Sequence, residues 1–230
     1  MKKPKRIVIV GAGGIGGWLI PSLCQFLHFC NKSQEKIEVI IFDGDIVEER
    51  NFERQNFQEL GAKAGLMKRK MSWFDSLRIT AFTEYITNDN VRKHIRDDDW
   101  VMLAVDNHAT RKLLSERFEE LSDGVLISGG NEYVDGCVNV YIREGGEDVT
   151  EPLTQSHPEI ANPNDKNPGE ASCEELAQTS APQLIFANQR AATIMNEVFY
   201  NLFIGHNLKV DRIYFNIQYL AQRAEQTKIK

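Results

Sequence analysis

The chain has 230 residues and a net charge of -6, from 27 basic and 33 acidic side chains. That balance argues against a protein that binds nucleic acid through a general electrostatic surface. No apolar run approaches about 18 residues and no signal peptide is evident, so neither a membrane span nor secretion is expected. Four cysteines without a Cys-x-x-Cys pair argue against a zinc knuckle and favour a reducing cytoplasmic location.

Apolar runs alternate with amphipathic segments along the first part of the chain. In chain order, the patterns predict a strand at 7–10, a helix at 18–29, a strand at 37–42, a helix at 62–77, strands at 78–86 and 100–105, a helix at 109–121, and strands at 124–128 and 137–143. Strands that alternate with helices are typical of an α/β, Rossmann-like, mainly parallel sheet with helices on both faces. A nucleotide-binding core at 1–142 is the corresponding domain prediction.

The remainder is expected to be a C-terminal extension of the same single domain, which spans 1–230. Four prolines interrupt residues 143–172, which favours a long loop over a packed element. We therefore expect a mobile loop at 143–180 that carries a candidate cysteine. A helix at 181–202, with Pro182 near its first turn, and a strand at 213–220 before a polar tip complete the predicted region at 181–230.

A glycine-rich loop follows the first strand. Gly11-x-Gly13-x-x-Gly16 places backbone N–H groups at a helix N-terminus, a geometry that binds phosphate. Asp43, at the end of the second strand, suits the hydroxyls of a ribose. Both features also occur in NAD-binding oxidoreductases, so they leave that alternative open. Gly11, Asp43 and Asp106 all follow predicted strands, and the carboxyl ends of parallel strands meet at one edge.

The segment after Asp43 discriminates between these alternatives. Asn51-x-x-Arg54-Gln55 offers amides and a guanidinium, which an NAD oxidoreductase does not need at this place. An enzyme that forms an acyl-adenylate must neutralise triphosphate charge as pyrophosphate leaves, and the fixed donors of Arg suit that role. Taken singly, each residue is better explained as part of a solvated surface helix.

Together these motifs resemble the ThiF/MoeB/ubiquitin-activating enzyme superfamily. The resemblance rests on Gly11–Gly16, Asp43–Gln55, Lys63-Ala64 and the pattern Asp106-Asn-x-x-x-Arg111, and it spans about the whole chain. Within the superfamily the chain looks most like the compact, zinc-free, PRTRC-type ThiF proteins. These share the motif Ser-Cys-Glu, found here around Cys173, and a terminal strand.

The resemblance implies a role for each matching residue. Gly11, Gly13, Gly14 and Gly16 would form the nucleotide loop, with Gly13 and Gly14 facing the phosphates. The others would act as follows: Asp43 on the ribose, Asn51 and Arg54 on the phosphates, Gln55 in support of that turn, Lys63 on the transferring phosphate, Asp106 on Mg²⁺, Asn107 beside the adenosine, and Arg111 as a tie between its helix and the motif.

Two assignments keep alternatives. The spacing from Arg54 to Lys63 is shorter than the family pattern, and Lys68 offers a Gly-x-x-Lys alternative after Gly65. We favour Lys63, because it keeps the following helix and strand at the family distance. Cys173 is either a nucleophile that forms a thioester or an inert cysteine; a thiolate near positive charge would favour the first.

The resemblance implies an ATP-dependent adenylyltransferase of the type that activates ubiquitin-like proteins. The enzyme would activate the C-terminal carboxylate of a small ubiquitin-like protein or peptide, with ATP and Mg²⁺ as cofactors and no zinc. A thioester on Cys173 is a possible second step, and a homodimer is the expected assembly. Family dimers often supply an arginine in trans from an N-terminal helix; here only Lys2, Lys3, Lys5 and Arg6 precede the first strand, so this contact is expected to be missing or to come from another protein. The alternatives are an NAD-binding Rossmann oxidoreductase and a non-catalytic ThiF-like partner subunit.

Overall fold

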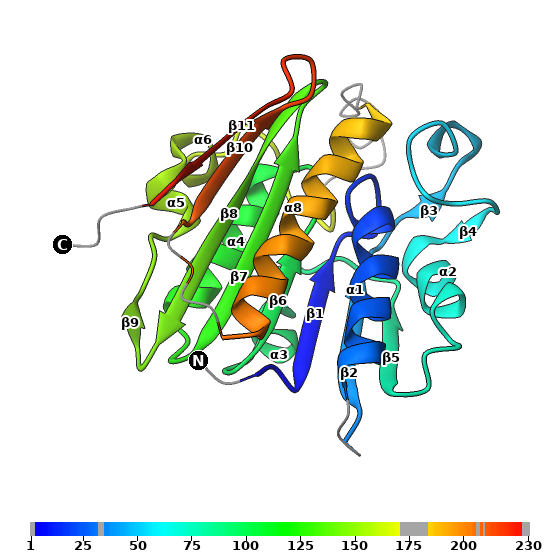
Figure 1. Cartoon of the computed structure of the whole chain (residues 1–230), viewed down its shortest axis with the longest axis horizontal. Coiled ribbons are helices and arrows are strands. Elements are labelled where there is room, and N and C mark those ends of the chain that lie inside the picture. Colours follow the sequence, from blue (N-terminus) through cyan, green and yellow to red (C-terminus); the bar gives the residue numbers. More distant parts are fainter. Residues whose placement is uncertain (1–2, 32–34, 171–183, 206–207, 209, 227–230) are drawn as a thin grey trace.

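A nine-stranded sheet forms the centre of the protein in the computed structural model, which describes residues 3–31, 35–170, 184–205, 208 and 210–226 (Figure 1). Its strand order is β11-β10-β8-β7-β6-β1-β2-β5, with β9 paired to β8. The parallel strands are β1 (Arg6–Val10), β2 (Ile37–Phe42), β5 (Leu77–Phe82), β6 (Trp100–Leu103) and β7 (Gly124–Asn131). The antiparallel strands are β8 (Asp135–Glu144), β9 (Glu147–Asp148), β10 (Arg212–Asn216) and β11 (Ala221–Glu225).

Helices cover both faces of this sheet, so the predicted fold class is confirmed. One face carries α1 (Gly16–Cys30), α2 (Lys63–Lys70) and α8 (Ile185–Phe203), and α1 and α8 pack side by side (Figure 1). The other face carries α3 (Val91–His94), α4 (His108–Glu119), α5 (Leu153–Ser156) and α6 (Pro158–Ala161).

The central strand β1 shows why its sequence is continuously apolar. Ile7 and Ile9 belong to the core under α1 and α8, whereas Val8 and Val10 belong to the core under α4. Successive side chains of a strand point to opposite faces, so a strand covered on both sides needs apolar residues at every position. No helix among the described residues combines the length and apolar character that a bilayer crossing requires.

Three predicted elements end earlier than expected, and the strand expected at 124–128 continues to Asn131 as β7. The helix at 62–77 ends at Lys70, after which Met71 and Phe74 are buried in a turn. The strand expected at 78–86 is β5, which ends at Phe82. The strand expected at 213–220 is β10, which stops at Asn216. A turn at 217–220 then leads to β11, in a region where only a polar tip was expected. β11 has mostly exposed side chains and no apolar alternation, so the sequence pattern gave no signal for it.

The prediction of an unpacked loop after residue 143 was wrong for the described part of that segment. The helices α5 and α6 bury Leu153 and Ile160 against the α4 side of the sheet. Pro152 lies directly before α5 and Pro158 is the first residue of α6, positions where a missing N–H does no harm. These two prolines therefore lie at helix starts. Residues 171–183, which include Pro182 and the expected start of the helix at 181–202, lie outside the described residues; that helix is described as α8 from Ile185 to Phe203.

Candidate nucleotide-binding site

The strand order places a topological switch point beside β1. β2 pairs with one side of β1 and β6 with the other, so the connections that leave these strands diverge. Ligands of open α/β sheets bind in the crevice at such a point, outside the carboxyl ends of the strands. Gly11 directly follows β1, Asp43 directly follows β2, and Asp106 lies just beyond β6. The structure thus brings the three predicted positions to one edge of the sheet.

The glycine loop has the shape that its sequence requires. Gly11 has φ 94°, and a Cβ built on it would lie 2.5 Å from the carbonyl oxygen of Ala104. A Cβ on Gly16 would lie 2.0 Å from the carbonyl oxygen of Gly11. Both positions therefore admit only glycine. Gly14 lies in the turn that leads into α1.

Gly13 lies next to two polar side chains. A Cβ built on Gly13 would have Gln55 Nε2 at 3.8 Å and Lys63 Nζ at 3.9 Å as its nearest neighbours. An amide and an ammonium group thus stand over the loop whose backbone is expected to receive phosphate. This arrangement suits a polyanionic ligand.

Asp43 is buried directly after the carboxyl end of β2. Its Oδ2 accepts a hydrogen bond from the Ala12 N–H at 2.6 Å, and its Oδ1 accepts one from the Asp45 N–H at 2.9 Å. Burial raises the pKa of Asp43 to about 6; the Lys63 ammonium and the two N–H donors oppose this shift, whereas the charge of Asp45 adds to it. The carboxylate is therefore fixed in place, as a group that receives ribose hydroxyls needs to be.

This raised pKa predicts a pH-dependent stability. Because the folded-state pKa lies above the unfolded value, the contribution of Asp43 to stability is present below about pH 4 and is lost as pH rises through about 6. The difference in unfolding free energy between the wild type and Asp43→Asn is expected to change by about 2–3 kcal/mol, to the disadvantage of the wild type, between pH 4 and pH 7. Urea unfolding at both pH values measures it, and a pH-independent difference would refute the assignment.

Lys63 is positioned by a two-stranded ribbon, β3 (Ile46–Val47) with β4 (Gly61–Ala62). The Lys63 N–H extends this pairing by donating to the carbonyl oxygen of Asp45 at 3.0 Å. Its Nζ lies 2.6 Å from Asp45 Oδ2, and only 6% of the residue is exposed. Lys68, in contrast, is exposed on α2. The ribbon closes the short connection from Arg54 and brings Lys63, not Lys68, to the glycine loop.

The turn around Asn51 is a 3-10 helix, η1 (Glu49–Asn51). The Asn51 side chain is buried and its Oδ1 accepts a hydrogen bond from the Glu48 N–H at 2.9 Å. Its carbonyl oxygen accepts from the N–H groups of Arg54 and Gln55 at 3.2 and 2.8 Å. Asn51 thus organises the turn that presents the next two residues; its direct contact with phosphate stays a prediction.

Arg54 and Gln55 lie where this turn meets α8. The carbonyl oxygen of Arg54 accepts a hydrogen bond from the buried Asn188 side chain at 3.3 Å, and Arg54 itself is half-buried. Gln55 is only 7% exposed, and its Oε1 has no hydrogen-bond partner among the described residues. A buried polar atom without a hydrogen-bond partner, next to a glycine loop, indicates a site that a ligand completes.

On the other side of β1, Asp106 precedes the first turn of α4. Asp106 is exposed, and no described Lys or Arg forms an ion pair with it. Asn107 caps α4, because its Oδ1 accepts from the Thr110 N–H at 2.8 Å. Arg111 donates to the carbonyl oxygens of Val105 at 2.8 Å and Gly129 at 3.3 Å, which ties α4 to the ends of β6 and β7 as expected.

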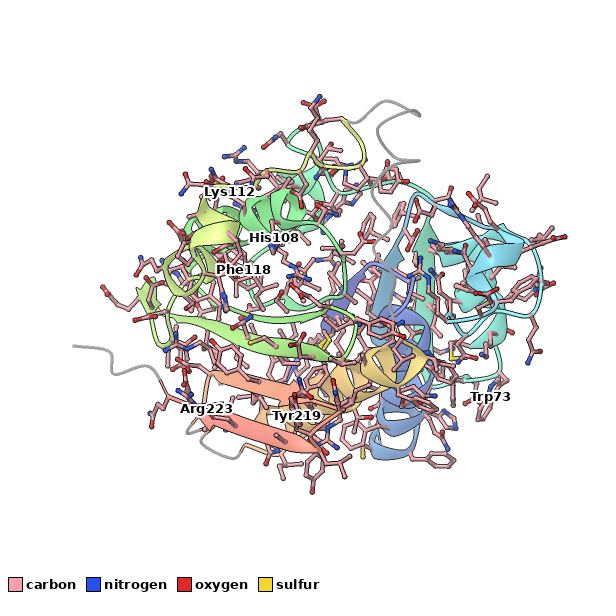
Figure 2. The ribbon with its side chains drawn as sticks, turned by 90° about the horizontal axis from the view of Figure 1, so that it is seen from above. Trp73, His108, Lys112, Phe118, Tyr219 and Arg223 are labelled. Carbon is pink, nitrogen blue, oxygen red and sulfur yellow. The ribbon has the colours of Figure 1, made fainter. Side chains whose placement is uncertain are left out.

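Sequence reasoning missed Asp165, which completes this helix start. Its carboxylate accepts hydrogen bonds from the N–H groups of His108 and Ala109 at 2.7 and 2.8 Å; His108 lies at the start of α4 in Figure 2. Nearby, Asn167 donates to the carbonyl oxygen of Ile86 at 2.8 Å. Asp165 is 57 positions from His108 in the sequence, so no local spacing could reveal it.

The donor set fits a magnesium ion only together with a nucleotide. Among the described residues there is no group of three or more His, Cys, Asp or Glu that could hold a metal. Mg²⁺ binds through one or two carboxylates plus phosphate oxygens and water, so the accessible carboxylate of Asp106 suits it once phosphates are present.

The described residues include three free cysteines, Cys24, Cys30 and Cys137. Cys173 lies outside the described residues, so its role stays a prediction. Burial raises the pKa of Cys24 and of Cys137 to about 12, which keeps both thiols protonated. Cys30 is exposed at the end of α1.

Comparison with known proteins agrees with this architecture. The model of the ThiF family matches residues 3–228. Among solved structures, PaaA has a TM-score of 0.69 at 16% identity, over 96% of this chain and 63% of its own length. Escherichia coli MccB crystallised with ATP has a TM-score of 0.69 at 16% identity, over 96% of this chain and 62% of its own. The complex of E. coli MccB with MccA-N7isoASN has a TM-score of 0.70 at 15% identity, over 96% and 64%.

The chain thus spans about 62–64% of the length of these solved structures, and at such identities they show a shared fold. No curated protein matches the chain. The family match covers nearly every residue, including the glycine loop, the ribbon and the start of α4. The chain therefore belongs to the ThiF family.

Proposed function

We propose that this protein uses ATP to adenylate the C-terminal carboxylate of a peptide or small protein. The observation that carries the proposal is the placement of Lys63 Nζ and Gln55 Nε2 over Gly13, within 4 Å of the Cβ position. Asp43 is hydrogen-bonded to Ala12 of this loop, where it would receive the ribose hydroxyls, and Asp106 lies across β1. Among the structural neighbours, E. coli MccB has been solved with ATP and with MccA, which supports ATP and a peptide or small protein as the ligands.

The chemistry follows from this arrangement. A carboxylate oxygen of the substrate forms a bond to the α-phosphorus of ATP as the bond to pyrophosphate breaks, so an acyl-adenylate forms without net proton transfer. Lys63 and Arg54 stabilise charge on the phosphates, and cationic donors in a partly dehydrated site are the largest contributors to such catalysis. Mg²⁺, held by Asp106 and phosphate oxygens, would neutralise charge on the leaving pyrophosphate.

Several finer parts of the proposal rest on the family resemblance. The substrate would be a ubiquitin-like protein or peptide with a free C-terminus, ending in Gly-Gly, and Cys173 could accept the activated acyl group as a thioester. A homodimer in the cytoplasm is the proposed setting. An NAD oxidoreductase would explain Gly11–Gly16 and Asp43. It would give no role to Lys63 or Gln55, and it would not explain why the chain belongs to the ThiF family.

Pyrophosphate exchange into ATP tests the proposal. Exchange is expected only when a peptide or small protein with a free C-terminus is present, and amidation of that terminus should abolish it. Asp106→Asn is expected to lower the exchange rate about 100-fold, because the ion loses its carboxylate ligand. Asp75→Asn, an exposed carboxylate between α2 and β5, is the matched control and should leave the rate unchanged. Equal rates in both variants would contradict the role of Asp106.

A further inference from the structure

A hydrogen-bonded chain connects Lys63 to a residue outside the family motifs. The Lys63 ammonium lies 2.6 Å from Oδ2 of Asp45, and the Tyr85 hydroxyl donates a hydrogen bond to Oδ1 of the same carboxylate. The Asp45 backbone is held as well, because its N–H donates to Asp43 at 2.9 Å and its carbonyl oxygen accepts from the Lys63 N–H at 3.0 Å. These four contacts fix Asp45. Three of them come from the segment between β2 and β5, and the fourth comes from Tyr85, which lies after β5.

Tyr85 itself is held by packing. A Cβ built on Gly44, between the two carboxylates, would lie 2.6 Å from the Tyr85 ring, so the ring rests directly against the glycine backbone. The carbonyl oxygen of Tyr85 accepts a hydrogen bond from the Asn90 side chain at 2.9 Å. The hydroxyl thus reaches Asp45 from a ring with little freedom to move.

The charges in this chain support one direction of hydrogen bonding. Burial, the hydrogen bond to Asp45, and the charges of Asp45, Asp43 and Asp106 all raise the pKa of Tyr85, so its hydroxyl stays protonated and donates. Burial acts to raise the pKa of Asp45, but the charge of Lys63 and the hydrogen bonds from Lys63 and Tyr85 outweigh it and lower that pKa. A nearly buried ammonium such as Lys63 needs this ionised partner.

We propose that Tyr85 is a positioning residue, which acts through Asp45 to hold the Lys63 ammonium beside the glycine loop. The Tyr85 hydroxyl occupies Oδ1, so the carboxylate plane is set and Oδ2 faces Lys63. This inference rests on the proposed function, because it gives Tyr85 a task in phosphate binding. It also explains why the residue between the two carboxylates is glycine: any side chain there would displace the Tyr85 ring.

The test compares two ligands by calorimetry, ATP–Mg²⁺ and adenosine, with Tyr85→Phe. The variant keeps the ring against Gly44 and removes only the hydroxyl. ATP–Mg²⁺ binding is expected to weaken about threefold to tenfold, the scale of one typical hydrogen bond, and adenosine binding should not change. In a Lys63→Met background, Tyr85→Phe should have no further effect on ATP–Mg²⁺. Tyr219→Phe, 75% exposed on the β10–β11 hairpin, is the control (Figure 2).

The outcomes separate this inference from the proposed function. If the wild type binds ATP–Mg²⁺ and Tyr85→Phe binds it equally well, the positioning role is refuted while the proposed function stands. Equal weakening of ATP–Mg²⁺ and adenosine, or an undiminished effect in the Lys63→Met background, would mean a merely structural role and would also refute it. If the wild type does not bind ATP–Mg²⁺, the proposed function fails and this inference fails with it.

Discussion

Lys63→Met is expected to lower the rate of pyrophosphate exchange by about 100-fold to 1000-fold, the usual effect of removing one preorganised donor from a transition state. Met keeps most of the apolar stem of Lys63, so the apolar contacts of this stem are preserved. What is lost is the ammonium group 3.9 Å from the Cβ position of Gly13. The measurement is the exchange rate at saturating ATP, with thermal unfolding as the check on folding.

Lys68→Met is the matched control, since Lys68 lies on the same helix but is exposed. Its exchange rate should equal that of the wild type. The reverse pattern, a loss with Lys68→Met and none with Lys63→Met, would show that the lysine of the family motif is Lys68. It would also remove the main geometric support for the proposed phosphate site.

Gly16→Ala is expected to destabilise the fold by about 3 kcal/mol or more, because the new Cβ would lie 2.0 Å from the carbonyl oxygen of Gly11. The glycine loop and the start of α1 must separate to admit the methyl group. Chemical denaturation measures this change. Nucleotide binding should weaken as well, since the backbone N–H groups of the loop shift with it.

Gly65→Ala provides the comparison for this substitution. Gly65 lies within α2, and a Cβ there would meet its nearest neighbour, Ala62, only at 4.0 Å. The same chemical change should therefore stabilise the protein by about 0.5–1 kcal/mol through helix propensity. If the two variants lose similar stability, close packing of the glycine loop is not what determines the effect.

Strands buried on both faces were predictable because their signal is local. β2 has the bounds that the apolar run predicted, and β1 begins one residue earlier than expected. The convergence of Gly11, Asp43 and Asp106 also followed from local information, since each directly follows or lies near the end of a predicted strand. Such features depend on the alternation of apolar and polar residues and on the rule that parallel strands end at one edge.

Other parts depended on contacts that the sequence does not display. Pro152 and Pro158 favoured a loop, yet both lie at helix starts, where proline is compatible with a packed segment. β11 is an exposed edge strand whose pairing with β10 leaves no apolar pattern. The hydrogen bond from Tyr85 to Asp45 joins residues 40 positions apart, so no motif spacing could predict it.

The short spacing between Arg54 and Lys63 shows how structure changes the meaning of a departure from a family pattern. From the sequence, that spacing supported a non-catalytic partner subunit. In the structure, the β3–β4 ribbon closes the connection and still brings Lys63 to Asp45 and to the glycine loop. The Lys63 ammonium group therefore lies beside Gly13 despite the shorter segment.

Thermal unfolding in the presence of two nucleotides tests the central claim most directly. At about 100 times its dissociation constant, a ligand stabilises the folded state by about 2.7 kcal/mol, which corresponds to about 5–10 °C for a domain of this size. ATP–Mg²⁺ is expected to raise the melting temperature of the wild type by this amount and that of Lys63→Met by less. NAD is expected to leave the melting temperature of the wild type unchanged. Stabilisation by NAD without stabilisation by ATP–Mg²⁺ would contradict the account.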